Sequence, residues 1–448
     1  MHALAGASGL YWHIFICRSP NCSRQATTAT RQLAARYAML DKSARFLRSR
    51  SPNYRVSPSP VPVPPPNSRK PSSSNRSVRK RDETRSDERP PLTLKSTEQL
   101  LIDAAAEIDG ASVLTISVGA AQAAAAVAYQ HPQSQVECDY FDVFLADCAR
   151  ERWANLPNLT IRCQSDLSEG PVDDVLLTLP AGGNTELARE LMQQAVLRMK
   201  PEGRLFASSD NPKDHWLHEQ LKDQFGKVTN RGFKSGKLYI GTQPKPIKKL
   251  KEYDFWFAFR DREQLIHARS RPGVFNHRAL DLGARALIES LTIPDGPQAG
   301  EVVHNGFNVL DLGCGSGAVG FAAAFRAANV RVHAIDANAR AIECTRDGAL
   351  KNGLAQHTTQ LEAEGRCEQS GEFDLVLANP PYFSNFKIGE IFLFAAQRAL
   401  RFGGRAHFVT KQPTWYTEQF SQVFDDVSVR EIRGYFIIKG TKRKSDWA

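Results

Sequence analysis

Two short segments in the second half of this 448-residue chain carry residue types that bind ligands. The first, VLDLGCGSG at residues 309–317, is typical of a strand end followed by three alternating glycines. Glycines at this spacing let the backbone turn tightly and approach a ligand before a helix starts, expected at 318–328. Asp311 precedes the glycines, and Asp336 ends the next expected strand, 330–335. We expect Asp336 to accept the hydrogen bonds of a ribose diol, although a helix cap also explains an acid there.

The glycine pattern alone does not define the ligand, because enzymes that bind dinucleotides use a related one. Their fingerprint needs a further glycine at position 318, where this chain has alanine. The position of Asp311, inside the strand end, is a second difference from that fingerprint. The segment therefore favours a ligand that has a ribose but no pyrophosphate.

The second segment is NPPY at residues 379–382, directly after the apolar strand expected at 375–378. It therefore lies at the carboxyl edge of the sheet, where doubly wound folds bind their ligands. The side-chain oxygen of Asn379 and the backbone carbonyl of Pro380 can accept both N–H groups of an exocyclic amine, which localises the lone pair toward an electrophilic methyl group. The prolines hold these acceptors in place, and Tyr382 offers a flat face on which a base can stack. A plain Pro-Pro turn after a strand is the alternative.

Composition separates the N-terminal segment from the rest of the chain. Residues 1–95 contain 18 Lys and Arg against 5 Asp and Glu, with 11 of the 25 prolines. Such a segment cannot bury enough apolar surface to fold, so we expect it to be disordered. Its alternatives are an organellar import signal, a misassigned start and a basic arm with non-specific RNA affinity. The rest of the chain has 40 basic and 43 acidic residues, so its charge does not by itself indicate nucleic acid.

The eight cysteines are scattered without a CxxC or CxxH pair, so we expect neither a zinc site nor disulfides. No apolar run reaches the length of a membrane span. These features favour a cytoplasmic protein without metal or membrane partners, with import into an organelle through residues 1–95 as the alternative.

Strands and helices alternate from residue 96 onward, which is typical of an α/β fold with a parallel, doubly wound sheet. We expect one domain at 96–243, a basic linker at 244–255 and a second domain at 256–448. The two halves look like copies, because three pairs of segments match: 113–119 with 309–315, 173–180 with 373–380, and 197–204 with 400–405.

Three matches in one order, at offsets of about 200 residues, favour a duplication over the chance similarity of buried strands. The first copy lacks the alternating glycines and the NPPY segment. We therefore expect two tandem Rossmann-like domains, the first degenerate and the second catalytic, after the basic tail.

Together these residues resemble the class I methyltransferases that modify exocyclic amines. More narrowly, the chain resembles the two-domain rRNA guanine-N2 methyltransferases, the small-subunit RNA methyltransferase C type and its large-subunit relative. RPGVF at 271–275, LDLG at 280–283 and LKNGL at 350–354 are similar to segments of that family. The resemblance covers about residues 96–442 and implies S-adenosylmethionine (AdoMet) as the cofactor. It implies that AdoMet binds at Asp311, Gly313, Cys314, Gly315, Gly317, Asp336 and, by position, Glu364, and that Asn379, Pro380 and Tyr382 are catalytic.

The sequence does not decide which acid would bind the adenine amine of the cofactor. Glu362 and Glu364 follow the strand expected at 358–361. A solvated loop acid is an equally good interpretation of either one.

The function implied by the resemblance is AdoMet-dependent methylation of a guanine N2 amine in small-subunit rRNA, with rRNA or a ribosomal subunit as the partner. The linker lysines and the nearby arginines would hold RNA, unless they form a solvated linker; they are Lys245, Lys248, Lys249, Lys251, Arg260, Arg262, Arg269 and Arg271. The alternatives are methylation of adenine N6 or of a protein glutamine amide, and a non-catalytic RNA-binding assembly factor. The sequence leaves the oligomeric state open.

Overall fold

The computed structural model describes residues 94–293, 306–381 and 386–443. The tail predicted at residues 1–95 therefore falls almost entirely outside the described residues. Tyr382 and the C-terminal residues 444–448 also lie outside them.

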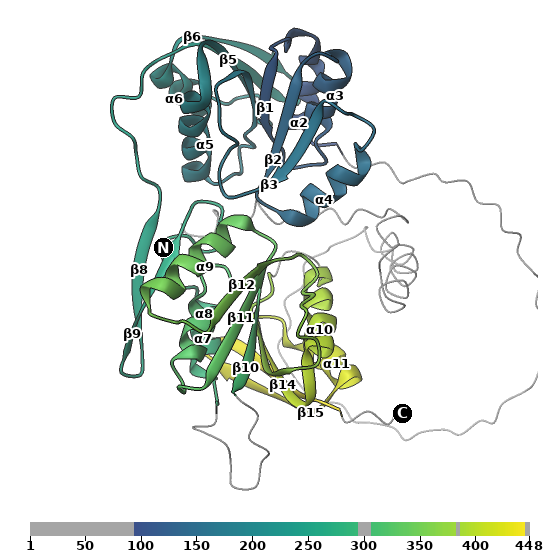
Figure 1. Cartoon of the computed structure of the whole chain (residues 1–448), viewed down its shortest axis with the longest axis vertical. Coiled ribbons are helices and arrows are strands. Elements are labelled where there is room, and N and C mark those ends of the chain that lie inside the picture. Colours follow the sequence, from purple (N-terminus) through teal and green to yellow (C-terminus); the bar gives the residue numbers. More distant parts are fainter. Residues whose placement is uncertain (1–93, 294–305, 382–385, 444–448) are drawn as a thin grey trace, which may run out of the picture. The chain divides into compact units, whose positions relative to one another are not determined.

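The first sheet contains seven strands in the order β3-β2-β1-β4-β5-β7-β6 (Figure 1). These strands are β1 Ser112–Ile116, β2 Gln135–Tyr140, β3 Leu159–Cys163, β4 Val172–Thr178, β5 Met199–Ser209, β6 Phe225–Phe233 and β7 Gly236–Pro244. The helices beside them are α2 Ser96–Asp103, the short η2 Ala105–Glu107, α3 Gln122–Gln130, α4 Val143–Arg152, α5 Thr185–Arg198 and α6 Trp216–Gln224. Strands β3 to β5 are parallel neighbours, whereas β7 is antiparallel to both β5 and β6.

The second sheet has the equivalent order, β12-β11-β10-β13-β14-β16-β15. Its strands are β10 Phe307–Leu312, β11 Val330–Asp336, β12 His357–Leu361, β13 Phe373–Ala378, β14 Leu400–Thr410, β15 Phe424–Ile432 and β16 Tyr435–Lys442. Its helices are α7 Leu282–Glu289, α8 Ala318–Ala324, α9 Ala339–Lys351, α10 Lys387–Ala399 and α11 Pro413–Val423. A separate hairpin, β8 Phe255–Asp261 with β9 Gln264–Ser270, precedes α7 and was not expected from the sequence.

The expectation of a fully parallel sheet is wrong for the last strands of each copy. Two residues join β6 to β7, and two join β15 to β16. A link this short can only connect antiparallel neighbours, because a parallel pair needs a crossover of a dozen or more residues. Each copy therefore contains a mixed sheet, in which five neighbouring strands are parallel and the hairpin at one edge is antiparallel.

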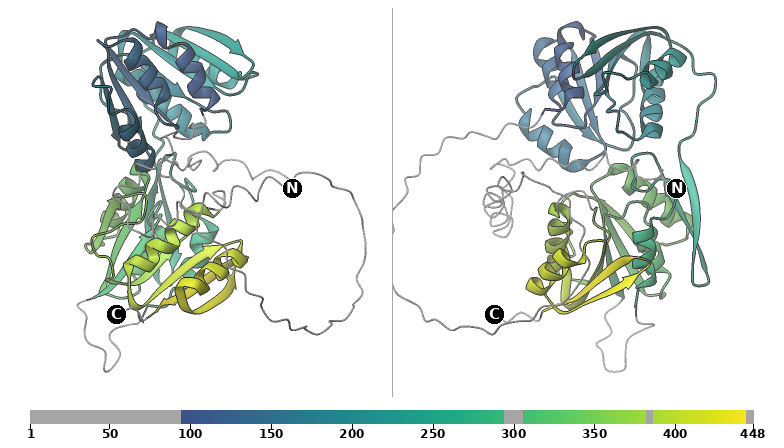
Figure 2. Two further views of the ribbon diagram at one scale, coloured as in Figure 1. Left: turned by 90° about the vertical axis from the view of Figure 1, so that its right-hand side faces the viewer. Right: turned by 180° about the vertical axis from the view of Figure 1, so that it is seen from behind.

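Each sheet is covered by helices on both faces (Figure 2). In the second copy, Val309 and Leu375 pack into the core on the side of α7 and α8, whereas Leu310 and Val376 pack on the side of α10 and α11. Successive side chains of a strand point to opposite faces, so a strand covered on both sides needs apolar residues at nearly every position. This explains the continuous apolar runs before the glycine loop and before the NPPY segment.

Equivalent turns of the two copies pair with each other. Residues 141–143 follow β2, and residues 337–339 follow β11. In each turn the third residue's N–H donates to the first residue's carbonyl in the other turn, at 2.9 and 2.7 Å. Asp142 and Asn338 are opposite each other in this bridge, and each caps the helix that follows it. Because the paired turns occupy equivalent places in the two copies, the contact is self-complementary, like a twofold interface.

Candidate functional site

The glycine loop connects β10 to α8. Gly313, Gly315 and Gly317 have positive φ angles of 71°, 57° and 78°, a region that residues with a Cβ rarely adopt. A Cβ on Gly315 would have no atom within 4 Å, so the backbone there borders open space. Gly317 instead lies against the ring of Phe321 in α8. The middle glycine of the loop thus faces open space, whereas the last glycine lets the loop pack against α8.

Two buried carboxylates lie beside this loop, at the ends of β10 and β11. Asp336 accepts hydrogen bonds from the N–H groups of Gly315 (2.9 Å) and Asn338 (2.8 Å), and Asp311 accepts one from Gly320 (2.9 Å). Burial raises the pKa of Asp336 to about 6. Burial, with a smaller contribution from the charge of Asp336, raises the pKa of Asp311 to about 7. No basic side chain among the described residues forms an ion pair with either acid, so a cationic ligand would stabilise their charged forms.

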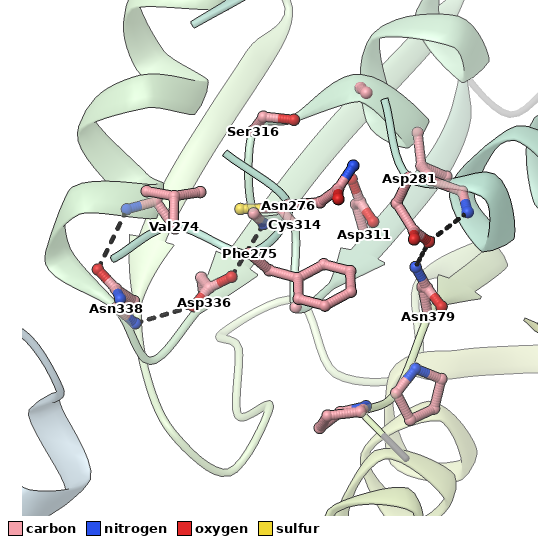
Figure 3. Close-up of a pocket in the computed structure, with 18 of the residues that line it drawn as sticks. Val274, Phe275, Asn276, Asp281, Asp311, Cys314, Ser316, Asp336, Asn338 and Asn379 are labelled. Atoms are coloured by element: carbon pink, nitrogen blue, oxygen red, sulfur yellow. Dashed lines mark hydrogen bonds between the residues drawn. The ribbon is translucent and has the colours of Figure 1, made fainter. Parts of the chain in front are cut away.

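Asn379 directly follows β13. Its Nδ2 donates a hydrogen bond to Oδ2 of Asp281 at 2.8 Å. The same Oδ2 accepts the N–H of Ala284 at 3.0 Å and so caps α7. Figure 3 shows Asp281 and Asn379 joined in this way, with Asp311 nearby. Among the residues that the structure describes, none donates a hydrogen bond to Oδ1 of Asn379.

One pocket joins the glycine loop, the two acids and Asn379 (Figure 3). Seven of the residues predicted from the sequence line it: Asp311, Gly313, Cys314, Gly315, Asp336, Asn379 and Pro380. The loop after β10, the end of β11 and the residues after β13 meet here because parallel strands present their carboxyl ends at the same edge of the sheet.

Two predicted residues do not line this pocket, and Tyr382 lies outside the described residues. Gly317 faces α8, as described above. Glu364 donates its N–H to Oε2 of Glu362 at 2.8 Å, and its carboxylate is 3.4 Å from the guanidinium of Arg366. The adenine-binding role suggested for Glu364 stays a prediction.

Sequence reasoning missed several pocket residues, among them Asp281, Phe275 and Asn338. Asp281 had a recognisable signal, since an acid directly before an apolar helix is a typical N-cap. Its second contact, with Asn379, joins residues far apart in the chain and has no signature in the sequence.

In the first copy, the equivalent loop is filled by the protein itself. Glu98 from α2 is buried there and accepts hydrogen bonds from Oγ of Ser117 at 2.5 Å and from a backbone N–H of α3 at 3.0 Å. Burial raises the pKa of Glu98. Tyr140 occupies the place of Asp336, and its hydroxyl donates to the carbonyl of Gly119. The first copy is therefore degenerate in its ligand loop, as the missing glycines predicted.

Two of the arginines expected to hold RNA are bound to acids instead. Arg271 is only 5% exposed, and Arg269 is also largely buried. Their partners are Asp166, Glu190, Asp254, Glu343 and Asp347. The expectation that they contact RNA is therefore wrong, because a nucleic acid would have to displace several buried ion pairs. Arg260 and Arg262 remain exposed on the β8–β9 hairpin.

Comparison with known proteins finds a family match in the second copy. Residues 266–439 match the family described as methyltransferase small domain. Because of this match, the segment is referred to below as the methyltransferase domain. The methyltransferase domain begins within β9 and ends within β16. It contains β10 to β15 and all residues of the pocket.

The chain also matches curated relatives. The Bacillus subtilis protein YbxB, described as uncharacterized, is 29% identical over 191 residues, which are 42% of this chain and 90% of that protein. Ribosomal RNA small subunit methyltransferase C of Shewanella piezotolerans is 26% identical over 280 residues, 60% of this chain and 78% of the relative. The protein of the same name from Chromohalobacter salexigens is 33% identical over 178 residues, which are half of its length.

A solved structure extends the likeness beyond the methyltransferase domain. The T. thermophilus 16S rRNA N2 methyltransferase (RsmC), in complex with AdoMet and guanosine, matches with a TM-score of 0.63 at 21% identity. The match covers 77% of this chain and 92% of that chain, which is too long for one copy alone. The predicted fold, two tandem Rossmann-like domains, and the predicted resemblance to the two-domain rRNA methyltransferases are confirmed.

In residues 94–293, 306–381 and 386–443, no group of three or more His, Cys, Asp or Glu side chains could hold a metal ion. No helix in these segments is long and apolar enough to span a membrane.

Proposed function

We propose that this chain transfers a methyl group from AdoMet to the N2 amine of a guanine in ribosomal RNA, with the small subunit as the substrate. The observation that carries the proposal is the pocket. It combines an open glycine loop with two buried acids and an asparagine. Within the described residues, the acids form no ion pair and the amide oxygen of the asparagine accepts no hydrogen bond. The reaction would take place where ribosomal subunits are found. This agrees with the cytoplasmic location that the sequence predicts for the protein.

The residues present fit AdoMet. Its sulfonium and ammonium groups are cationic, and Asp311 and Asp336 lack a cationic partner among the described residues. Asp336 would hold the ribose hydroxyls, and the backbone at Gly313 to Gly315 borders the space that a ligand would fill. When bound, the cofactor supplies an electrophilic methyl group.

Asn379 and Pro380 would hold the amine that accepts the methyl group. The lone pair of an exocyclic amine is delocalised into its ring, so the nitrogen is a weak nucleophile. Acceptance of its two N–H groups by the amide oxygen of Asn379 and the carbonyl of Pro380 would localise that pair on nitrogen. Proline fixes the backbone and Asp281 holds the amide, so neither acceptor has to reorganise during the reaction.

The choice of guanine in rRNA rests on the relatives. Several are named ribosomal RNA small subunit methyltransferase C, and the solved structure was determined with guanosine. The ligand loop of the first copy is filled by the side chain of Glu98, so the binding of a second cofactor does not explain why this copy is retained. Its retention is consistent with a role in holding a large substrate. Methylation of adenine N6 or of a glutamine amide, the second candidate, could use the same acceptors, but the names of the relatives do not favour it.

Transfer of labelled methyl groups to ribosomal subunits that lack the modification tests the proposal. We expect label in N2-methylguanosine of the small subunit with the full chain, and labelling that is about 10²–10³-fold slower with Asn379→Ala. Label in methyladenosine or in protein would replace guanine with the second candidate. A chain that binds no AdoMet in calorimetry would refute both enzymatic proposals and favour an assembly factor.

A further inference from the structure

We propose that Asp281 is a positioning residue that fixes the orientation of the Asn379 amide, so that its oxygen and not its NH2 group is available to the substrate. This inference rests on the proposed function, because it concerns the acceptor side of the same pocket. It assigns a role to a residue that neither the glycine loop nor the NPPY segment contains.

The first step of the inference is the chemistry of the two groups. An asparagine amide can flip, exchanging a donor for an acceptor at the same place. An ionised carboxylate can only accept hydrogen bonds. Oδ2 of Asp281 lies 2.8 Å from Nδ2 of Asn379, so the flipped amide would place its oxygen against a carboxylate oxygen. Asp281 therefore selects the orientation in which Nδ2 donates to the protein, while Oδ1 accepts no hydrogen bond from the described residues.

The second step is the rigidity of Asp281 itself. Its Oδ2 also accepts the N–H of Ala284 at 3.0 Å and caps α7, whose residues Ala286, Leu287 and Ile288 are buried in the core. The carboxylate is thus tied to a packed helix. Gly283 leaves room for the pair, because a Cβ there would lie 2.9 Å from Oδ2 of Asp281 and 3.1 Å from Oδ1 of Asn379.

The third step is what the substrate needs. An amine that attacks a methyl group presents N–H donors, so the residue that holds it must offer an acceptor. A flipped Asn379 would present a second donor to the amine and repel it. The orientation set by Asp281 should therefore affect the rate of transfer far more than the binding of AdoMet.

Three substitutions separate positioning from capping. Asp281→Ser keeps a side-chain oxygen that can cap α7 but is too short to reach Asn379. Asp281→Asn keeps an oxygen at the same distance and should rescue most of the activity. Asn184→Ala removes the cap of α5 in the first copy, away from the pocket, and serves as the matched control for a loss of helix stability.

We expect Asp281→Ser to lower kcat about 10- to 100-fold, the range for a lost hydrogen bond to a charged group, with the Kd for AdoMet within about twofold of the original. Asp281→Asn should lower kcat less than about fivefold. Asn184→Ala should lower the Tm but leave kcat unchanged. In an Asn379→Ala background, Asp281→Ser should have no further effect on kcat, because the amide that it orients is gone. The inference would be overturned if Asp281→Ser lowered kcat as much in the Asn379→Ala background as in the original protein. It would also be overturned if Asp281→Ser and Asp281→Asn lowered kcat equally.

A spectroscopic measurement keeps this test separate from the test of the proposed function. The side-chain NH2 protons of Asn379, observed by NMR in the full chain, should be protected from exchange in the original protein and in Asp281→Asn but not in Asp281→Ser. If label goes to adenine or glutamine, the guanine proposal fails while the kcat pattern of the Asp281 variants stands. If Asn379 exchanges equally fast in all three proteins, the positioning role fails even where guanine is the substrate.

Discussion

Removal of the charge of Glu190 should destabilise the chain strongly, because its two arginine partners are buried. Glu190 lies on α5 of the first copy, and its side chain is 7% exposed. One of its oxygens is 2.6 Å from Nη1 of Arg340 and the other is 2.8 Å from Nη2 of Arg271, both in the second copy. The guanidinium of Arg340 is completely buried.

The magnitude follows from what Arg340 would retain in Glu190→Gln. Its remaining neighbours are two backbone carbonyls, those of Ser165 and Pro272, the ring of Phe141, and Asp166 at 3.9 Å. Loss of one partner of a buried pair costs about 3–5 kcal/mol, because the other charge stays buried without compensation. The neutral acceptors place the expected loss near the lower end, at about 3 kcal/mol.

Urea unfolding followed by tryptophan fluorescence measures this loss as a lower midpoint with an unchanged slope. The matched control is Glu186→Gln on the same helix, whose partner Arg278 is 40% exposed. An exposed pair contributes about 0–1 kcal/mol, so the control should shift the midpoint little. Equal shifts in the two variants would show that the buried pair carries no special stability, and the reasoning from burial would be refuted.

Four further predictions concern the pocket. AdoMet affinity should fall about tenfold or more from pH 8 to pH 5, because Asp311, with a pKa of about 7, must be ionised to face a cationic ligand, and Asp336, with a pKa of about 6, must be ionised to accept both hydrogen bonds of the ribose; calorimetry that gives a flat profile would contradict their role. Gly315→Val, at a φ of 57°, should weaken AdoMet binding at least about tenfold with a smaller effect on Tm, and equal affinity would show that no ligand approaches there. Asn379→Ala should lower kcat by about 10²–10³-fold in single-turnover assays while AdoMet still binds. Glu364→Ala should leave AdoMet affinity within about twofold, because its carboxylate already pairs with a nearby arginine; a larger loss would support the role implied by the family resemblance.

The central features of the pocket could be predicted from the sequence because they are local. Glycines at 313 and 315 and the acids at 311 and 336 lie at strand ends, and the strands are recognisable as apolar runs. Once a parallel sheet is assumed, its geometry brings the ends of those strands to one edge. The duplication was visible for the same reason, since matching strand ends recur at a nearly constant offset.

What could not be predicted depends on contacts between distant segments. Arg269 and Arg271 stand in a basic stretch and suggested RNA contacts, yet their acidic partners lie up to 105 residues away in the chain. Asp281 is an ordinary helix cap by its neighbours, and only the fold brings Asn379 to it. The antiparallel edge strands were missed because the alternation of strands and helices suggests a parallel sheet until the two-residue links are seen.

The pairing of equivalent turns gives the first copy a purpose that its own filled loop does not. Residues 337–339 begin directly after Asp336, and Asn338 donates its N–H to that acid. One side of this turn is bound by residues 141–143 of the first copy, and the acid at its start is bound by the backbone of Gly315. The segment that would hold the ribose is therefore fixed from the cofactor loop and from the first copy together. Because both sets of contacts restrain one turn, we expect docking of the first copy and binding of AdoMet to affect each other, and any such coupling must change both equilibria by the same factor.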